Sequence, residues 1–143
     1  MFAIYDYSNY ENNAIVYVTL NPVIENDQDF DTFLYKWMEL YYKKKEFIFI
    51  FDTCNVGFIP LKYSLRMTIF IKKLKKQPHQ YLQKSIILIN NNVVKHMLDF
   101  IFMLQPPVAP VFITNIKSEI GSIIDNKHHN ARVILPGTTF LNL

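Results

Sequence analysis

The fold of this chain is decided by residues 47–66, FIFIFDTCNVGFIPLKYSLR. The first five residues are β-branched or aromatic, and such an unbroken apolar run is typical of a strand buried on both faces of a sheet. Asp52 and a short polar turn follow, and Pro60 stands where a helical pattern begins and a missing N–H costs nothing. The stretch therefore predicts a central strand, a turn at its carboxyl end and a helix.

The flanking sequence continues this alternation. Two strand-like runs separated by a polar turn predict an N-terminal β-hairpin, at residues 2–7 and 14–20. Apolar runs predict further strands at 47–51, 85–89 and 111–114. Helical spacing predicts helices at about 25–44, 61–76, 94–102 and 116–125. The order β-β-α-β-α-β-α-β-α predicts an α/β fold with a mixed, mostly parallel sheet of about five strands and helices packed on it.

Two of the predicted helices carry a clear core stripe. The stripe of the first is formed by Phe30, Phe33, Leu34, Trp37, Leu40 and Tyr41. The stripe of the second is formed by Tyr63, Met67, Phe70, Ile71 and Leu74. Both helices are therefore expected to lie with one face on the sheet.

Composition bounds the class of protein. The 143 residues, half of them hydrophobic, predict one globular domain over 1–143 with a short C-terminal extension at about 126–143. The single cysteine excludes an internal disulfide, and no run resembles a signal peptide or reaches the roughly 20 apolar residues of a membrane span. A cytoplasmic or otherwise intracellular protein is expected.

Charge divides the chain into two halves. Residues 1–60 carry a net charge of −5, whereas residues 61–143 carry +8. This division is compatible with an electrostatic partner surface, and equally with two solvated faces of one fold.

The turn after the central strand resembles a family motif. Residues 49–59, FIFDTCNVGFI, match the strand, the Asp and the hydrophobic-x-Phe-hydrophobic segment of STAS domains, the anti-sigma-factor antagonist family. The resemblance implies that the chain has the α/β fold of STAS domains and a non-catalytic role in protein interaction. In STAS domains an Asp-Ser-Ser-Gly tetrapeptide follows and carries the regulatory phosphoserine, but this chain has Pro60–Tyr63, PLKY, there. The phosphorylation switch is therefore expected to be absent.

A second resemblance extends further along the chain. Residues 78–90, PHQYLQKSIILIN, and the closing 135–138, LPGT, are similar to segments of CRAL-TRIO lipid-binding domains, which share this order of elements. This resemblance implies the alternative function, a lipid- or phosphoinositide-binding module with an apolar cavity between the sheet and the second or third helix. The chain is shorter than the larger members of that family, so a deep cavity is not expected.

Enzyme signatures are missing from the sequence. Asp52 and Cys54 could supply an acid and a thiol, but no His is nearby to activate the thiol, and a packed structural cysteine is the simpler interpretation. His128 and His129 are adjacent, so they do not have metal-ligand spacing. No enzymatic activity, cofactor or metal site is expected.

The sequence thus favours an interaction or assembly module. Its partner, a protein or a second copy, is expected on the turn after the strand and the start of the following helix, at Asp52, Thr53, Cys54, Asn55, Lys62 and Arg66. An acidic partner or a lipid headgroup is expected at the end of that helix, at Lys72, Lys73, Lys75 and Lys76, although cations there also complement the helix dipole. Nucleic acid is not favoured, because no recognition module accompanies the lysines.

Overall fold

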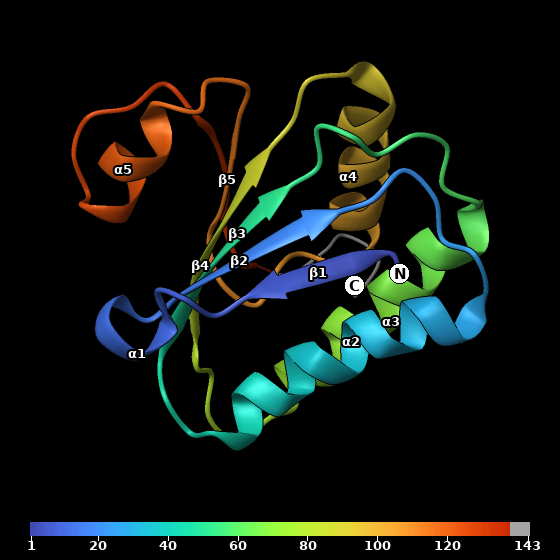
Figure 1. Ribbon diagram of the computed structural model, residues 1–143, viewed down its shortest axis with the longest axis horizontal. Coiled ribbons are helices and arrows are strands. Elements are labelled where there is room, and N and C mark those ends of the chain that lie inside the picture. The colour runs from blue at the N-terminus through green and yellow to red at the C-terminus, as the bar shows by residue number, and fades with distance from the viewer. Residues whose placement is uncertain (138–143) are drawn as a thin grey trace.

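The computed structural model describes residues 1–137 (Figure 1). Helices and strands alternate along most of the chain. The strands are β1 (Ala3–Asp6), β2 (Ile15–Leu20), β3 (Phe47–Asp52), β4 (Leu82–Leu88), β5 (Val111–Thr114) and β6 (Arg132–Ile134). The helices are α1 (Tyr10–Asn13), α2 (Asp27–Tyr42), α3 (Leu61–Lys75), α4 (Asn92–Leu104) and α5 (Glu119–Ile124).

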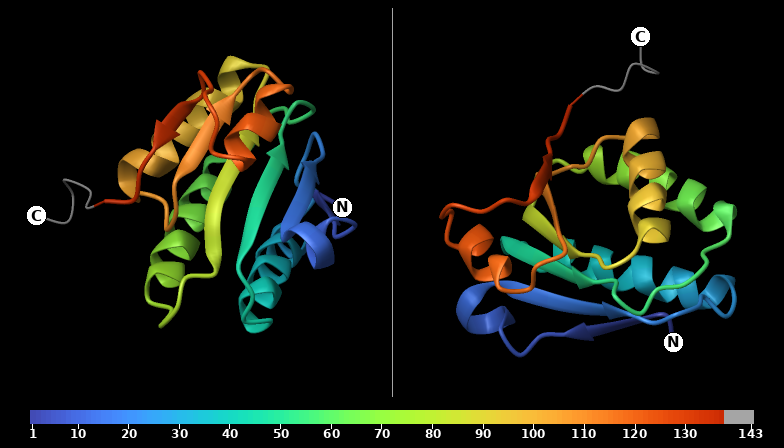
Figure 2. Two further views of the ribbon diagram at one scale, coloured as in Figure 1. Left: turned by 90° about the vertical axis from the view of Figure 1, so that its left-hand side faces the viewer. Right: turned by 90° about the horizontal axis from the view of Figure 1, so that it is seen from above.

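The six strands lie in the sheet in the same order as in the sequence. The four strands β2 to β5 are parallel. The edge strands β1 and β6 each run antiparallel to their neighbour. Crossovers between parallel strands are right-handed, and here every crossover advances in the same direction, so successive helices fall on one face. Figure 2 shows α2, α3 and α4 together on that face and α5 on the other.

The main core lies between the sheet and the three helices. Phe49 of the central strand is fully buried, and aromatic rings surround it. Its ring centroid lies 4.9 Å from that of Trp37, 5.0 Å from that of Phe47 and 4.6 Å from that of Phe51. The contacts with Trp37 and Phe47 are edge-to-face and that with Phe51 is tilted, and such aromatic pairs add to the stabilisation from burial. The predicted stripes of the two helices face this core, with Leu34 and Met67 partly buried at its margin.

The opposite face of the sheet is only partly covered. Ile50 and Ile86 of the central strands pack against Ile123 of α5 in a small second core. Because α5 is a six-residue helix, the outer strands on this face stay more open, and Ile4 of β1 is 49% exposed.

Helix starts follow simple capping chemistry. The Asn26 side chain accepts a hydrogen bond from the backbone N–H of Asp29, and Asn91 does the same for Val94. Asn is among the best N-cap residues, because its side-chain oxygen satisfies one of the free N–H groups of the first turn. The Asn run at 90–92 thus positions α4.

The predicted α/β class, N-terminal hairpin and mostly parallel sheet are confirmed. Two elements were missed. The hairpin turn contains the single-turn helix α1, and Ala14, which follows the helix as its C-cap, has a left-handed φ of 57°. The segment expected to form the C-terminal extension supplies β6, so within residues 1–137 the sheet has six strands rather than about five. Residues 138–143 of that extension, including Thr138 of the LPGT motif, lie outside the described residues.

Candidate functional site

The predicted site at the end of β3 is divided between the two faces of the sheet, because side chains alternate along a strand. Thr53 points toward the three helices, where it is buried and donates a hydrogen bond to the backbone oxygen of Leu88 at 2.7 Å. Asp52 points to the opposite face. Of the predicted turn residues, Asn55 is exposed and Cys54 is half-buried.

Asp52 is held in its ionised form. Its carboxylate accepts hydrogen bonds from the Tyr17 hydroxyl at 3.1 Å and from the Cys54 backbone N–H at 3.0 Å. Burial alone would raise the pKa of Asp52, but these hydrogen bonds, with a further one from the Cys54 side chain and the charge of Lys117, hold it below the ordinary value. This arrangement makes Asp52 a fixed acceptor that ties β2 to the turn.

Cys54 lacks the environment of a nucleophile. Burial and the adjacent Asp52 carboxylate raise the pKa of the Cys54 thiol, whereas a reactive cysteine needs a lowered one. This supports the interpretation of Cys54 as a packed structural residue.

Lys62 and Arg66 are already engaged within the molecule. Lys62 forms an ion pair with Asp27 at 3.1 Å, and Arg66 forms one with Asp31. Tyr63 reinforces the contact by donating a hydrogen bond to Asp27 at 2.9 Å. The acidic N-terminal half of the chain and the basic C-terminal half therefore meet between α2 and α3.

The predicted headgroup-binding lysines lie at the end of α3. Lys72, Lys73 and Lys76 are exposed and form no ion pair within residues 1–137. The fourth, Lys75, donates a hydrogen bond to the backbone oxygen of Gly137 at 3.1 Å.

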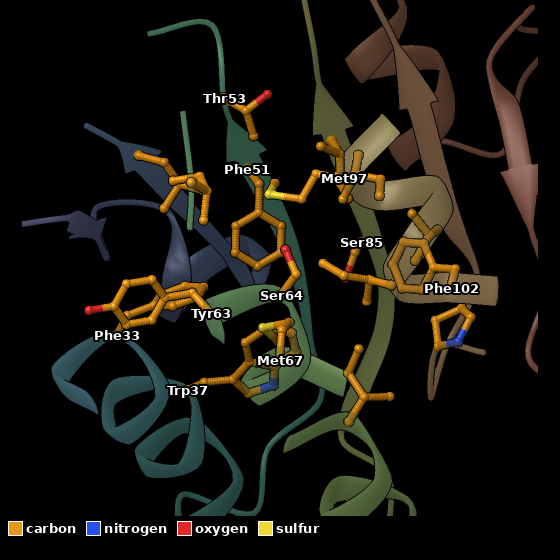
Figure 3. A pocket seen from close by; sticks show the side chains of 18 of the residues that line it. Phe33, Trp37, Phe51, Thr53, Tyr63, Ser64, Met67, Ser85, Met97 and Phe102 are labelled. Atoms are coloured by element: carbon orange, nitrogen blue, oxygen red, sulfur yellow. The ribbon is translucent and has the colours of Figure 1, made fainter. Parts of the chain in front are cut away.

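A partly open cavity of about 120 Å³ lies between the sheet and helices α2, α3 and α4 (Figure 3). Its walls are almost entirely apolar and come from elements distant in sequence. They include Phe33 and Trp37 of α2, Phe51 of β3, Tyr63 and Met67 of α3, Ile87 of β4, and Met97 and Phe102 of α4. Ser64 and Ser85, both buried, bring hydroxyl groups into this apolar lining.

Trp37 is the unusual residue of the cavity wall. It is the only tryptophan of the chain and is 6% exposed, and its buried indole Nε1–H has no hydrogen-bond partner among residues 1–137. Leaving a buried donor unpaired costs about 1 to 3 kcal/mol, so this group needs an explanation. The sequence placed Trp37 in the core stripe, and periodicity could not show that its N–H would be unpaired.

Residues 1–137 contain no cluster of three His, Cys, Asp or Glu side chains that could hold a metal ion. His128 is exposed, and His129 uses Nδ1 to accept a hydrogen bond from the Ala131 backbone. Among the described helices, none is both long and apolar enough to cross a bilayer.

Comparison of the chain with family models, with curated proteins and with solved structures gives no match.

Proposed function

We propose that this chain is a non-catalytic binding module whose cavity beneath α2, α3 and α4 holds a small apolar ligand or the end of one acyl chain. The proposal is supported by one observation above all, the unpaired Trp37 Nε1–H on the wall of an apolar cavity. It follows the alternative that the CRAL-TRIO resemblance implies. The expectation of a protein partner at residues 53–57 and the start of α3 stays a prediction.

The volume of the cavity limits the size of the ligand. An apolar cavity of about 150 Å³ stays dry and takes up benzene, so the volume here suits about five or six carbon atoms. Sites for drug-sized ligands are larger, about 300 to 1,000 Å³. Free small molecules and single acyl-chain ends share this chemistry, whereas a whole lipid does not fit.

The cavity wall also offers one hydrogen-bond donor, the Trp37 Nε1–H. An apolar ligand that carries a carbonyl or ether oxygen can accept the hydrogen bond that Trp37 Nε1–H lacks. The proposed ligand is therefore compact, neutral and apolar, and among such ligands those with one acceptor oxygen gain an additional hydrogen bond.

Filling the cavity is expected to block the ligand. In Ser85→Leu, the larger side chain enters the cavity from β4, so binding of cyclopentanone should weaken at least about tenfold, while the protein gains about 1 kcal/mol in stability. Fluorescence of Trp37, excited where tyrosine does not absorb, measures the binding directly because the chain has one tryptophan.

The matched control is Ser118→Leu, at an exposed N-cap whose side chain makes no capping bond. Unchanged affinity is expected there. Equal affinity in wild type and Ser85→Leu, or no saturable binding to wild type, would contradict the proposal. Native mass spectrometry of protein isolated without detergent separates the two ligand sources, because a retained lipid and a small molecule differ in mass.

The role of the Trp37 N–H is tested with ligands of equal shape. Methylenecyclopentane replaces the oxygen of cyclopentanone by a CH₂ group, so the ratio of the two affinities cancels the shape of the ligand. This ratio should favour cyclopentanone about two- to tenfold more in wild type than in Trp37→Phe, which has no N–H, as measured by calorimetry. A ratio that is the same in both proteins would show that the ligand does not accept from Trp37.

A further inference from the structure

The outward face of α3 carries an apolar row that the fold does not use. Leu61, Leu65 and Ile69 follow at intervals of four residues, and they are 60%, 42% and 56% exposed. Residues spaced in this way lie above one another on one side of a helix. Phe58 precedes the helix and is 77% exposed. The opposite side of α3, with Met67, faces the cavity.

The row continues into positive charge. Lys72 and Lys76 extend the spacing along the same side of the helix, and Lys73 lies beside them. All three lysines are exposed and outside the ion pairs formed by residues 1–137. Residues 61–76 include no Asp or Glu, so no acidic side chain of this segment neutralises the lysines.

We propose that this face, comprising Phe58, Leu61, Leu65, Ile69, Lys72 and Lys76, docks on an anionic membrane surface. An interfacial helix needs aliphatic or aromatic side chains that enter the acyl boundary, with lysines at the level of the anionic headgroups. The α3 face has both, in a row about 22 Å long along the helix axis. Isolated apolar side chains on a surface need no explanation, but a continuous row that ends in lysines without an ion pair to any described residue fits a charged apolar interface.

Docking in this orientation would bring the cavity close to the membrane. The helix that meets the lipid with its outer side lines the cavity with its inner side, so about one helix diameter, 10 to 12 Å, separates the two. The docking proposal does not depend on a ligand in the cavity, because it rests on exposed residues alone.

The lysines are tested with vesicles of phosphatidylcholine containing about 30 mol% phosphatidylserine, in a sedimentation assay. Each lysine near an anionic surface contributes about a fivefold factor to binding, so Lys72→Gln/Lys73→Gln/Lys76→Gln should lose about 100-fold. The control Lys43→Gln/Lys117→Gln/Lys127→Gln removes the same charge from exposed lysines elsewhere and should bind like wild type. Binding should also weaken as salt is raised.

The apolar row is tested with Leu61→Gln/Leu65→Gln/Ile69→Gln, which keeps helix propensity and charge. Vesicle binding should fall at least about tenfold, whereas Tyr35→Gln/Tyr42→Gln on the exposed side of α2 should leave it unchanged. Unaltered circular dichroism of each variant shows that the fold is intact.

Three results would overturn the docking proposal. They are absence of wild-type binding to the anionic vesicles, equal binding to vesicles of phosphatidylcholine alone, and equal losses in the control variants. The first of these would favour a protein partner for the same face. None of them affects the cyclopentanone measurement, so failure of docking and failure of ligand binding are distinguishable.

Discussion

Replacing Phe49 by alanine is expected to lower the free energy of unfolding by about 3 to 5 kcal/mol, the range for a buried phenylalanine. Phe49 is fully buried in the central strand, and its ring meets Trp37, Phe47 and Phe51. The substitution removes these contacts and leaves a cavity that the neighbouring rings cannot fill without leaving their rotamers. Urea denaturation measures this loss of unfolding free energy, provided that wild type and variant have the same slope of free energy against urea concentration.

The matched control is Phe58→Ala, because Phe58 is 77% exposed. Its effect on unfolding is expected to stay within about 0.5 kcal/mol. A loss below about 1 kcal/mol for Phe49→Ala would show that the aromatic cluster is not the centre of the core.

Alkaline pH is expected to destabilise the protein between about pH 10 and 12. Burial is the main cause that raises the pKa of Tyr41 and of Tyr17, each to about 12, and it raises that of Tyr5 as well. Unfolded tyrosines release their protons near pH 10, whereas the folded protein keeps them, so stability is lost as the pH rises through this window. Tyr41 alone accounts for about 2 kcal/mol, and half-buried Tyr17 for less.

The variant Tyr41→Phe isolates this contribution. Its stability should fall less steeply between pH 10 and 12 than that of wild type, because one raised phenol is gone. Tyr42→Phe is the control, since Tyr42 is 69% exposed, and its slope should equal that of wild type. Identical slopes in all three proteins, from urea denaturation at several pH values, would contradict the role assigned to Tyr41.

Most of the fold could be predicted from local sequence. The unbroken run at 47–51 indicated the centre of the sheet, and the spacing of Phe30, Phe33 and Trp37 indicated which side of α2 meets it. These signals are local, because side chains repeat every two residues in strands and about every 3.6 in helices. The three-residue strand β6 was missed, since Arg132 and Val133 are exposed and show no strand-like alternation.

The site was predicted less well, because it depends on contacts between distant segments. The sequence placed Asp52 and Thr53 together on a binding surface, but strand alternation puts them on opposite faces. In the sequence, Lys62 and Arg66 have no acidic partner nearby. In the fold, α2 places Asp27 and Asp31 beside them. The CRAL-TRIO alternative implied an apolar cavity beside the second or third helix, but the sequence left open whether one exists, since no pattern within one segment reveals a gap between four packed elements.

The sequential order of the strands also bears on how the chain can fold. Each strand pairs only with its neighbours in sequence, as in the parallel pairing of Val16 with Phe49 and of Phe49 with Ser85. The longest loops that these pairings must close are therefore about 30 to 40 residues, and loop-closure entropy grows only slowly with length. Within residues 1–137, no strand pairs with a segment from the far end of the polypeptide. The sheet can grow from β2 and β3 outward, one strand and helix at a time, as the chain leaves the ribosome.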